Sequence, residues 1–166
     1  MNLRGEQGGV DVPADGRSGQ LVTFRVGTEE FGVPIMDVYE IIFVPDITCI
    51  PRSPEAFIGV INLRGEIIPV IDMGIQFWGE KADTSRKRRI IVTSSHHRIV
   101  GLLVDEVTEV LRVEESNRVS APGLMHTAQT AYMKAIYNMD SRIIVQLDLD
   151  QLLKHADLAS IHHEIY

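Results

Sequence analysis

Residues 61–72, INLRGEIIPVID, contain two apolar runs on either side of the turn residues Arg64 and Gly65. Val and Ile favour strands, and glycine readily takes the positive φ of a tight turn, so the stretch predicts a β-hairpin. Pro69 has no N–H to donate, which predicts an edge strand or a residue whose N–H side faces outward. Arg64 is then either half of a structural ion pair or part of a recognition surface.

Segments of the same texture recur from residue 20 onward, separated by turn residues, as in an all-β protein. Two short helices are also predicted: Ser53, Pro54 and Glu55 carry a helix-start signal, and Asp148 and Asp150 are alternative caps for LDQLLKH. The ten predicted strands are 21–26, 30–35, 38–43, 57–63, 67–72, 88–94, 98–104, 107–113, 131–139 and 142–148.

An internal repeat organises these strands. A shift of 69 residues places FGVPIMDVYEII (31–42) on VGLLVDEVTEVL (100–111) and matches Glu40 with Glu109. A shift of 76 residues places GVINLRGEIIPVID (59–72) on AIYNMDSRIIVQLD (135–148). The chain therefore looks like two five-stranded halves with a seam at 79–89.

The predicted lobes cover about 20–79 and 86–153, between an N-terminal tail at 1–19 and a C-terminal tail at 154–166. The N-terminal tail has five glycines and few apolar residues, which favours flexibility. Where the first copy of the repeat has LRGE the second has MDSR, so Arg64 is not required to close this kind of hairpin. That difference favours a role for Arg64 that is local to its own lobe.

The composition excludes several classes of function. The chain has 166 residues and a net charge of -7, which argues against nucleic acid as a main partner. Cys49 is the single cysteine, so it cannot form an intramolecular disulfide and nothing indicates an oxidising compartment. It is expected to be a small buried apolar residue. No apolar run reaches the roughly 18 residues of a membrane helix. The expected location is the cytoplasm.

No catalytic or metal-binding constellation is found, because the motifs GxSxG, HExxH and the phosphate-binding glycine loops are absent. His96 and His97 lie at a predicted turn and are interpreted as solvated. Asp72 and Asp148 each follow an apolar strand and precede a short helical segment, which favours helix capping over acid catalysis. No cofactor and no metal ligand are predicted. His162, His163 and Glu164 are closer to a ligand set but lie near the C-terminus, where segments usually fray, and His126 and His155 stand alone.

Four segments resemble the CheW-like domain of bacterial chemotaxis signalling: EFGVPIMDVYEI (30–41), FIGVINLRGEIIPVIDM (57–73), GLLVDEVTEVLRV (101–113) and YMKAIYNMDSRIIVQLDLDQLL (132–153). The chain departs from the family pattern at Ala135, where a glycine is common. The resemblance implies two SH3-like five-stranded β-barrels that exchange a segment in some members. It also implies a non-enzymatic adaptor that couples a chemoreceptor's cytoplasmic helical hairpin to the histidine kinase CheA, in arrays at the membrane.

Carried over residue by residue, the resemblance places the receptor-binding site on Val38, Glu40 and Arg64, with Arg64 close enough to pair with Glu40. Binding of the kinase's regulatory domain is expected on exposed apolar strands around 101–113, at Gly101, Leu102, Val104, Val107 and Val110. A different class of function stays open, namely a two-barrel protein that binds a small molecule, or an enzyme whose site is assembled from several turns.

Overall fold

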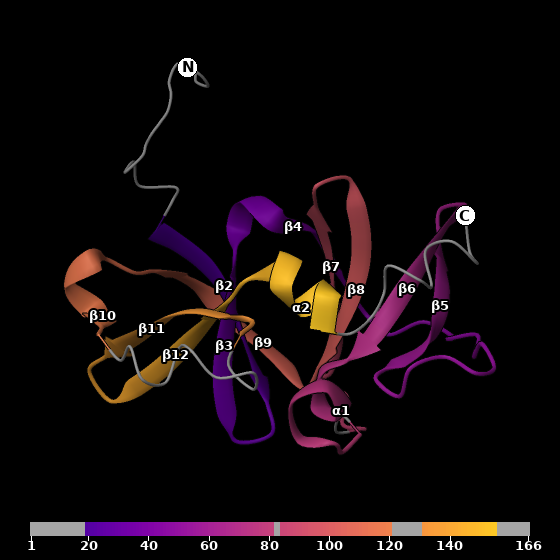
Figure 1. Ribbon diagram of the computed structural model, residues 1–166, viewed down its shortest axis with the longest axis horizontal. Helices are drawn as coiled ribbons and strands as arrows, with labels where there is room; N and C mark the ends of the chain where they lie inside the picture. Colours follow the sequence, from indigo (N-terminus) through magenta and orange to yellow (C-terminus); the bar gives the residue numbers. More distant parts are fainter. Residues whose placement is uncertain (1–18, 82–83, 121–130, 156–166) are drawn as a thin grey trace.

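The computed structural model describes residues 19–81, 84–120 and 131–155. Most of the tails predicted at 1–19 and 154–166, namely 1–18 and 156–166, lies outside these residues, as does His126. The part outside includes His162, His163 and Glu164. The chain forms β2 (Gln20–Val26), β3 (Glu29–Pro34), the 3₁₀ turn η2 (Ile35–Asp37), β4 (Val38–Ile42), β5 (Phe57–Leu63), β6 (Glu66–Asp72), α1 (Met73–Trp78), β7 (Arg89–Ser95), β8 (Arg98–Val104), β9 (Glu106–Arg112), η3 (Glu115–Asn117), β10 (Arg118–Val119), β11 (Met133–Met139), β12 (Arg142–Leu147) and α2 (Leu149–His155) (Figure 1).

The strands form two sheets that lie side by side in Figure 1. One sheet has five strands in the order β4-β7-β8-β6-β5, and the other has six in the order β10-β11-β12-β3-β2-β9. The described residues are therefore mainly strands with the short helices α1 and α2, which confirms the predicted all-β fold class, and this architecture is consistent with two small barrels. The sixth strand, β10, spans only Arg118–Val119 and was not predicted.

The sheet orders reproduce the internal repeat. The shift of 76 residues carries β5 onto β11 residue for residue, and the shift of 69 carries β4 onto β9. The order β4-β7-β8-β6-β5 then corresponds, strand by strand, to β9-β2-β3-β12-β11. Each sheet consequently takes three strands from one copy of the repeat and its central hairpin from the other copy.

This exchange means that the seam predicted at 79–89 does not separate the two sheets. Strands β2 and β3 precede the seam but pair with β9 and β12, which follow it. The physical reason is the parallel pairing of β3 with β12 and of β6 with β8, since each parallel pair joins strands that are distant in sequence. A first lobe at 20–79 and a second at 86–153 are therefore not the spatial units.

A shared core joins the two sheets. Buried side chains of β2 and β3 pack with those of β7 and β8 in a single cluster, which Leu149, Leu152 and Leu153 of α2 complete. A second cluster lies within the five-stranded sheet around Ile61, and a third within the six-stranded sheet around Ile144. Both sheets therefore pack on one common apolar layer. In Figure 1, α2 lies between the two sheets.

Two aspartates start the helices, as predicted. The Asp72 side chain accepts a hydrogen bond from Ile75 N–H at 3.2 Å, and Asp148 accepts one from Gln151 N–H at 3.2 Å. Asp148, not Asp150, is therefore the cap of α2. The helix continues to His155, two residues past the predicted limit of the domain at 153.

Two local predictions are wrong. No helix follows Ser53, because its hydroxyl donates to the carbonyls of Ile50 and Phe57 and stabilises a turn instead. Cys49 is exposed and not buried, since it lies between β4 and β5 in a segment that forms no regular strand.

Pro69 lies in an internal strand, so the edge alternative is wrong. Its pairing position opposite Val60 needs no donor, because Val60 exchanges both backbone hydrogen bonds with Thr48, at 2.8 and 2.9 Å. Pairing of β6 with β8 begins only at Val70. The missing N–H of Pro69 therefore leaves both neighbouring ladders intact.

Candidate partner-binding site

The ion pair predicted between Glu40 and Arg64 is present. Arg64 Nη1 donates to Glu40 Oε2 at 3.2 Å, and Nη2 donates to Oε1, so the contact is bidentate. The exposed fractions of the side chains are 63% for Arg64 and 31% for Glu40. The hydrogen bond from Arg64 holds the pKa of Glu40 below its usual value, and the same bond raises the pKa of Arg64.

The two residues come from opposite edges of one sheet. Glu40 is on β4, the first strand in the sheet order, and Arg64 lies in the turn that ends β5, the last strand. A flat sheet would keep them several strand spacings apart. Their contact shows that the sheet curls on itself, and the antiparallel bridge between Thr48 and Val60 closes the same gap in the backbone.

The hairpin turn fixes the start of the Arg64 side chain. Arg64 has φ 50° and Gly65 has φ 91°, the two positive values of a tight hairpin turn. The N–H of Gly65 donates to the side-chain oxygen of Asn62 at 2.8 Å. Arg64 is therefore presented by a defined turn and not by a loose loop.

Val38, the third residue predicted for receptor binding, is half-buried at the start of β4 and packs on the core shared by the two sheets. The neighbouring exposed side chains were missed by the sequence analysis. They are large and apolar, namely Met36 at 70%, Tyr39 at 58%, Ile41 at 41% and Phe43 at 75% exposure. The sequence did contain a signal for this exposed apolar surface. VYEIIF has apolar residues on both faces of the strand, although a half-buried edge strand needs them on one face only.

Three of the five residues predicted for kinase binding are inaccessible. Gly101, Leu102 and Val104 are buried in β8, which is flanked by β7 and β6, and Leu102 and Val104 are each 0% exposed. A Cβ added to Gly101 would come within 2.8 Å of Ile90, so the position is also tightly packed. The expected exposed strand at 101–104 is corrected accordingly.

The other two predicted residues are on β9, at the edge of the six-stranded sheet. Val107 is half-buried and packs on the shared core, whereas Val110 is 53% exposed. Val110 pairs with Val22 of β2, so it shares a face with a buried residue but projects beyond the edge of the core. β9 is therefore the accessible part of the predicted surface.

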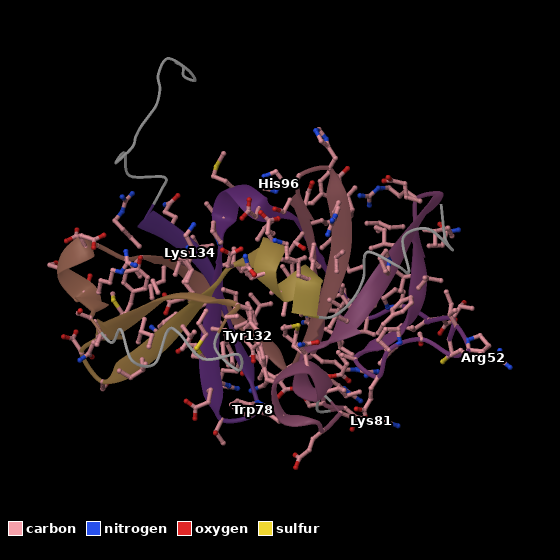
Figure 2. The ribbon with its side chains drawn as sticks, viewed as in Figure 1. Arg52, Trp78, Lys81, His96, Tyr132 and Lys134 are labelled. Atoms are coloured by element: carbon pink, nitrogen blue, oxygen red, sulfur yellow. The ribbon has the colours of Figure 1, made fainter. Side chains whose placement is uncertain are left out.

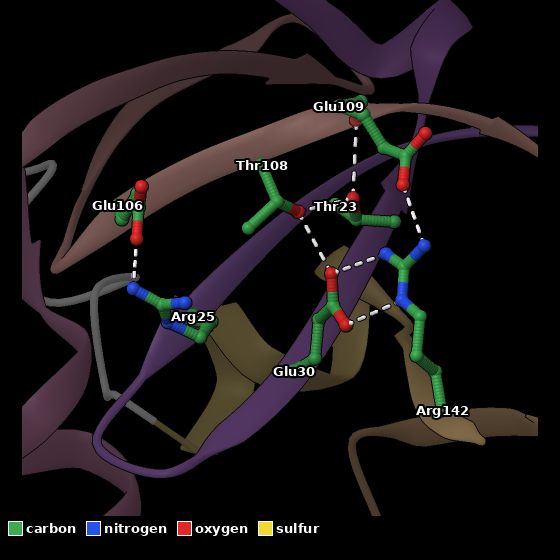
Figure 3. A network of polar contacts seen from close by, with 7 residues as sticks. All are labelled: Thr23, Arg25, Glu30, Glu106, Thr108, Glu109 and Arg142. Atoms are coloured by element: carbon green, nitrogen blue, oxygen red, sulfur yellow. Dashed lines mark hydrogen bonds and ion pairs between the residues drawn. The ribbon is translucent and has the colours of Figure 1, made fainter.

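A polar network that the sequence analysis missed links four strands of the six-stranded sheet (Figure 3). Arg142 of β12 binds both carboxylate oxygens of Glu30 on β3, with Nε at 3.1 Å and Nη2 at 2.7 Å, and also reaches Glu109 of β9 at 2.5 Å. Thr108 donates to Glu30 at 2.7 Å, and the hydroxyls of Thr108 and Thr23 lie 2.5 Å apart.

The network favours the charged form of Glu30. Burial alone would raise its pKa, but hydrogen bonds from Arg142 and Thr108 outweigh burial and lower the pKa below the usual value of 4.5. Hydrogen bonds to Glu30 and Glu109 raise the pKa of Arg142. The carboxylate and the guanidinium therefore stay charged and paired across the parallel β3–β12 contact.

A third polar contact ties the β7–β8 turn to α2. His96 is labelled in Figure 2. Its Nδ1 lies 2.9 Å from Oδ1 of Asp150, and Oγ of Ser95 lies at the same distance from that oxygen. His96 and His97 both have positive φ and are exposed, as expected for turn residues. The contact with His96 holds the pKa of Asp150 below its usual value. The carboxylate of Asp150 therefore binds the β7–β8 turn, close to the cap residue Asp148.

Ala135, the departure from the family pattern, is buried inside β11 and does not lie in the hairpin turn. Its repeat equivalent is Gly59, which has φ 148° and lies so close to Thr48 that an added Cβ would meet the Thr48 oxygen at 2.2 Å. The register shifts at both positions. Both hairpins therefore have a bulge at this position. The glycine occurs in the hairpin whose strand β5 also forms the bridge to Thr48.

The described residues present exposed apolar and charged surfaces. Within 19–81, 84–120 and 131–155, no three His, Cys, Asp or Glu side chains lie together as metal ligands. None of the helices in that part of the chain has the length and apolar character of a membrane span. Exposed edge strands and a bidentate ion pair at a hairpin turn are features of a protein-binding scaffold.

The chain belongs to the family of the CheW-like domain, whose family model matches residues 20–157. It is 34% identical over 138 residues to the probable chemotaxis protein CheW of Rhizobium etli, covering 83% of this chain and 89% of the relative. It is 30% identical to the chemotaxis protein CheW of Klebsiella aerogenes, covering 86% of each chain. The scaffolding protein TtCheW of Thermoanaerobacter tengcongensis has a similar crystal structure, with a TM-score of 0.74 and 33% identity over 86% of this chain and 92% of the other.

Proposed function

We propose that this chain is the non-enzymatic adaptor of a chemotaxis-type array, coupling a chemoreceptor's cytoplasmic helical hairpin to the regulatory domain of the histidine kinase CheA. Family membership supports the coupling role, and the relatives carry the names of chemotaxis and scaffolding proteins. The single observation that carries the receptor part is the bidentate contact of Arg64 with Glu40 next to an exposed apolar strand. The protein would act in the cytoplasm, recruited to receptors in the membrane.

The receptor would contact Val38, Glu40 and Arg64. An arginine fork already oriented by a carboxylate loses little side-chain entropy when a second carboxylate binds nearby. Tyr39, which lies beside Arg64 and is 58% exposed, supplies apolar surface whose burial favours association. Arginine and aromatic side chains are both enriched at protein–protein interfaces.

The kinase's regulatory domain would contact the edge of the six-stranded sheet. Val110 on β9 supplies an exposed apolar side chain, and Val107 supports it from the shared core. The buried residues Gly101, Leu102 and Val104 would act only by shaping β8 behind this surface. The receptor and the kinase would then be bound through different sheets.

Reconstitution of receptor-containing membranes with CheA tests the coupling role. Adding the full chain is expected to raise kinase autophosphorylation, and Arg64→Ala is expected to abolish that increase while leaving binding to the isolated kinase domain unchanged. An Arg64→Ala protein that activates the kinase normally would rule out the receptor site proposed here. No effect of the wild-type chain on the kinase would rule out coupling of that pair.

Calorimetry with the isolated kinase domain tests the second surface. Val110→Glu is expected to weaken binding at least tenfold, because it places a charge on an apolar contact. Ile143→Glu is a matched control, since Ile143 is 52% exposed on another strand of the same sheet. Binding should show a negative heat-capacity change, the signature of apolar burial. Equal losses in both variants would contradict a specific surface on β9.

A further inference from the structure

An open hollow of about 420 Å³ lies between the end of β4 and the segment that leads into β7. Phe43 and Val44 line one side of it, and residues of the segment that precedes β7 line the other. The register of the sheet explains this arrangement, because the pairing of β4 with β7 ends at Ile42 and Ile90, and the two segments separate beyond that pair. The hollow is lined by Phe43, Val44, Thr84, Ser85, Arg86, Arg88 and Arg89.

The basic side of the hollow is held in shape by backbone contacts. Nη1 of Arg89 donates to the carbonyls of Arg86 and Arg88, each at 2.8 Å. The guanidinium carbon of Arg89 lies 4.3 Å from the centre of the Phe43 ring, a cation–π arrangement. Arg89 therefore connects the basic segment to the aromatic wall.

Arg86 and Arg88 supply the charge of the hollow. Within the described residues, no carboxylate lies within 4.0 Å of either guanidinium, whereas Lys87 faces Glu106 at 3.8 Å. Arg86 and Arg88 thus place positive charge near Phe43 on a protein whose net charge is -7, while Arg86 also borders a second hollow that Asp105 and Glu106 line. A local field of this sign attracts an acidic partner and does little for folding.

The aromatic side of the hollow places a second requirement on a binding partner. Phe43, the residue after β4, is 75% exposed, and Ile41 on β4 is 41% exposed. Contiguous exposed apolar side chains on a folded protein indicate an interaction surface. A partner that satisfies both sides must present carboxylates beside an aromatic or apolar side chain.

We propose that this hollow is a docking site for an acidic peptide segment that carries an aromatic side chain. The aromatic side chain packs on Phe43, and flanking carboxylates bind Arg86 and Arg88. Charge complementarity selects this occupant, because the described residues of the lining include three arginines and no carboxylate. The site is separate from the proposed receptor site. Glu40 and Ile42 share the sheet face of Ile90 and Val92, whereas Ile41 shares the face of Ile91.

Random copolymers test the proposal without knowledge of a partner's sequence. Fluorescently labelled poly(Glu,Tyr) is titrated with the full chain, in parallel with labelled polyglutamate and a single-stranded oligonucleotide. The expected result is binding of poly(Glu,Tyr) at least tenfold tighter than binding of the other two probes, and weaker with added salt. Equal affinity for polyglutamate would remove the aromatic requirement and overturn the proposal. Tighter binding of the oligonucleotide would assign the site to nucleic acid instead.

Substitutions locate the site. The double variant Arg86→Glu with Arg88→Glu is expected to weaken poly(Glu,Tyr) binding at least tenfold, and Phe43→Ser to remove the preference for tyrosine. The control is Lys134→Glu with Lys154→Glu, which changes the net charge equally on exposed residues of β11 and α2. Thermal melting checks that each variant is folded. An equal loss in the control would show that net charge alone drives binding and would overturn the proposed site.

Discussion

Arg64 and Arg142 bind equivalent glutamates from different positions of equivalent hairpins. Arg64 lies in the β5–β6 turn and binds Glu40, whereas Arg142 is the first residue of β12 and binds Glu109. Glu40 and Glu109 match in the internal repeat. The second hairpin therefore also has an arginine that binds the equivalent glutamate, two residues further along the chain than the equivalent of Arg64. The interpretation that only one copy of the repeat has such an arginine is revised.

The two arginines should differ in their contribution to stability. Arg64 is 63% exposed, so we expect Arg64→Ala to melt within about 2 °C of the wild type, since exposed pairs gain little against screening and side-chain entropy. Arg52→Ala is the matched control, because Arg52 is also exposed and has a positive φ. Thermal melting by circular dichroism measures both. A loss of several degrees confined to Arg64→Ala would make its role structural.

Arg142→Ala should be clearly destabilising. It removes both hydrogen bonds to Glu30, whose side chain is only 15% exposed, and leaves a largely buried carboxylate without its cation. A loss of about 1–3 kcal/mol in the free energy of unfolding is expected, as for a buried charged group deprived of its partner. Urea titration measures this loss. A change as small as that of Arg64→Ala would mean that water replaces the guanidinium.

Glu30 should make stability depend on acid. Because its pKa is lower in the folded protein than its usual value of 4.5, its contribution is fully present above about pH 4.5 and is lost as the pH falls below that value. Glu30→Gln is expected to be less stable at pH 7 and to show a flatter decline between pH 5 and pH 3. Urea titrations across this range measure the slope, and an unchanged slope would exclude Glu30 as its source.

Gly59→Ala should disrupt closure of the five-stranded sheet. Gly59 has φ 148°, and an added Cβ would meet the Thr48 oxygen at 2.2 Å, so the Thr48–Val60 bridge must open or the strand must shift. Strain of this kind costs about 1–3 kcal/mol. The control is Ala135→Gly, which makes the equivalent position of the other hairpin a glycine. Hydrogen exchange of the Thr48 and Val60 amides should rise in Gly59→Ala, and unchanged protection would contradict this account.

The strands were predictable because each is a short apolar run bounded by turn residues, and the repeat placed β5 and β11 in equivalent positions. The burial of β8 was also within reach, since GLLV is apolar at successive positions and such a run is typical of a strand covered on both faces. The contact between Glu30 and Arg142 was not, because it depends on a parallel pairing between residues 112 positions apart. Local patterns carry no information about such a pairing.

The exchange of central hairpins has a consequence for how such a molecule can be divided. A chain with one copy of the repeat would lack the two middle strands of its own sheet, so it would be complete only as a reciprocally swapped dimer. Joining the copies in one polypeptide replaces that concentration-dependent assembly with an intramolecular one. The molecule is in this respect a fused two-fold dimer, and its two halves expressed as separate chains should fold only in each other's presence.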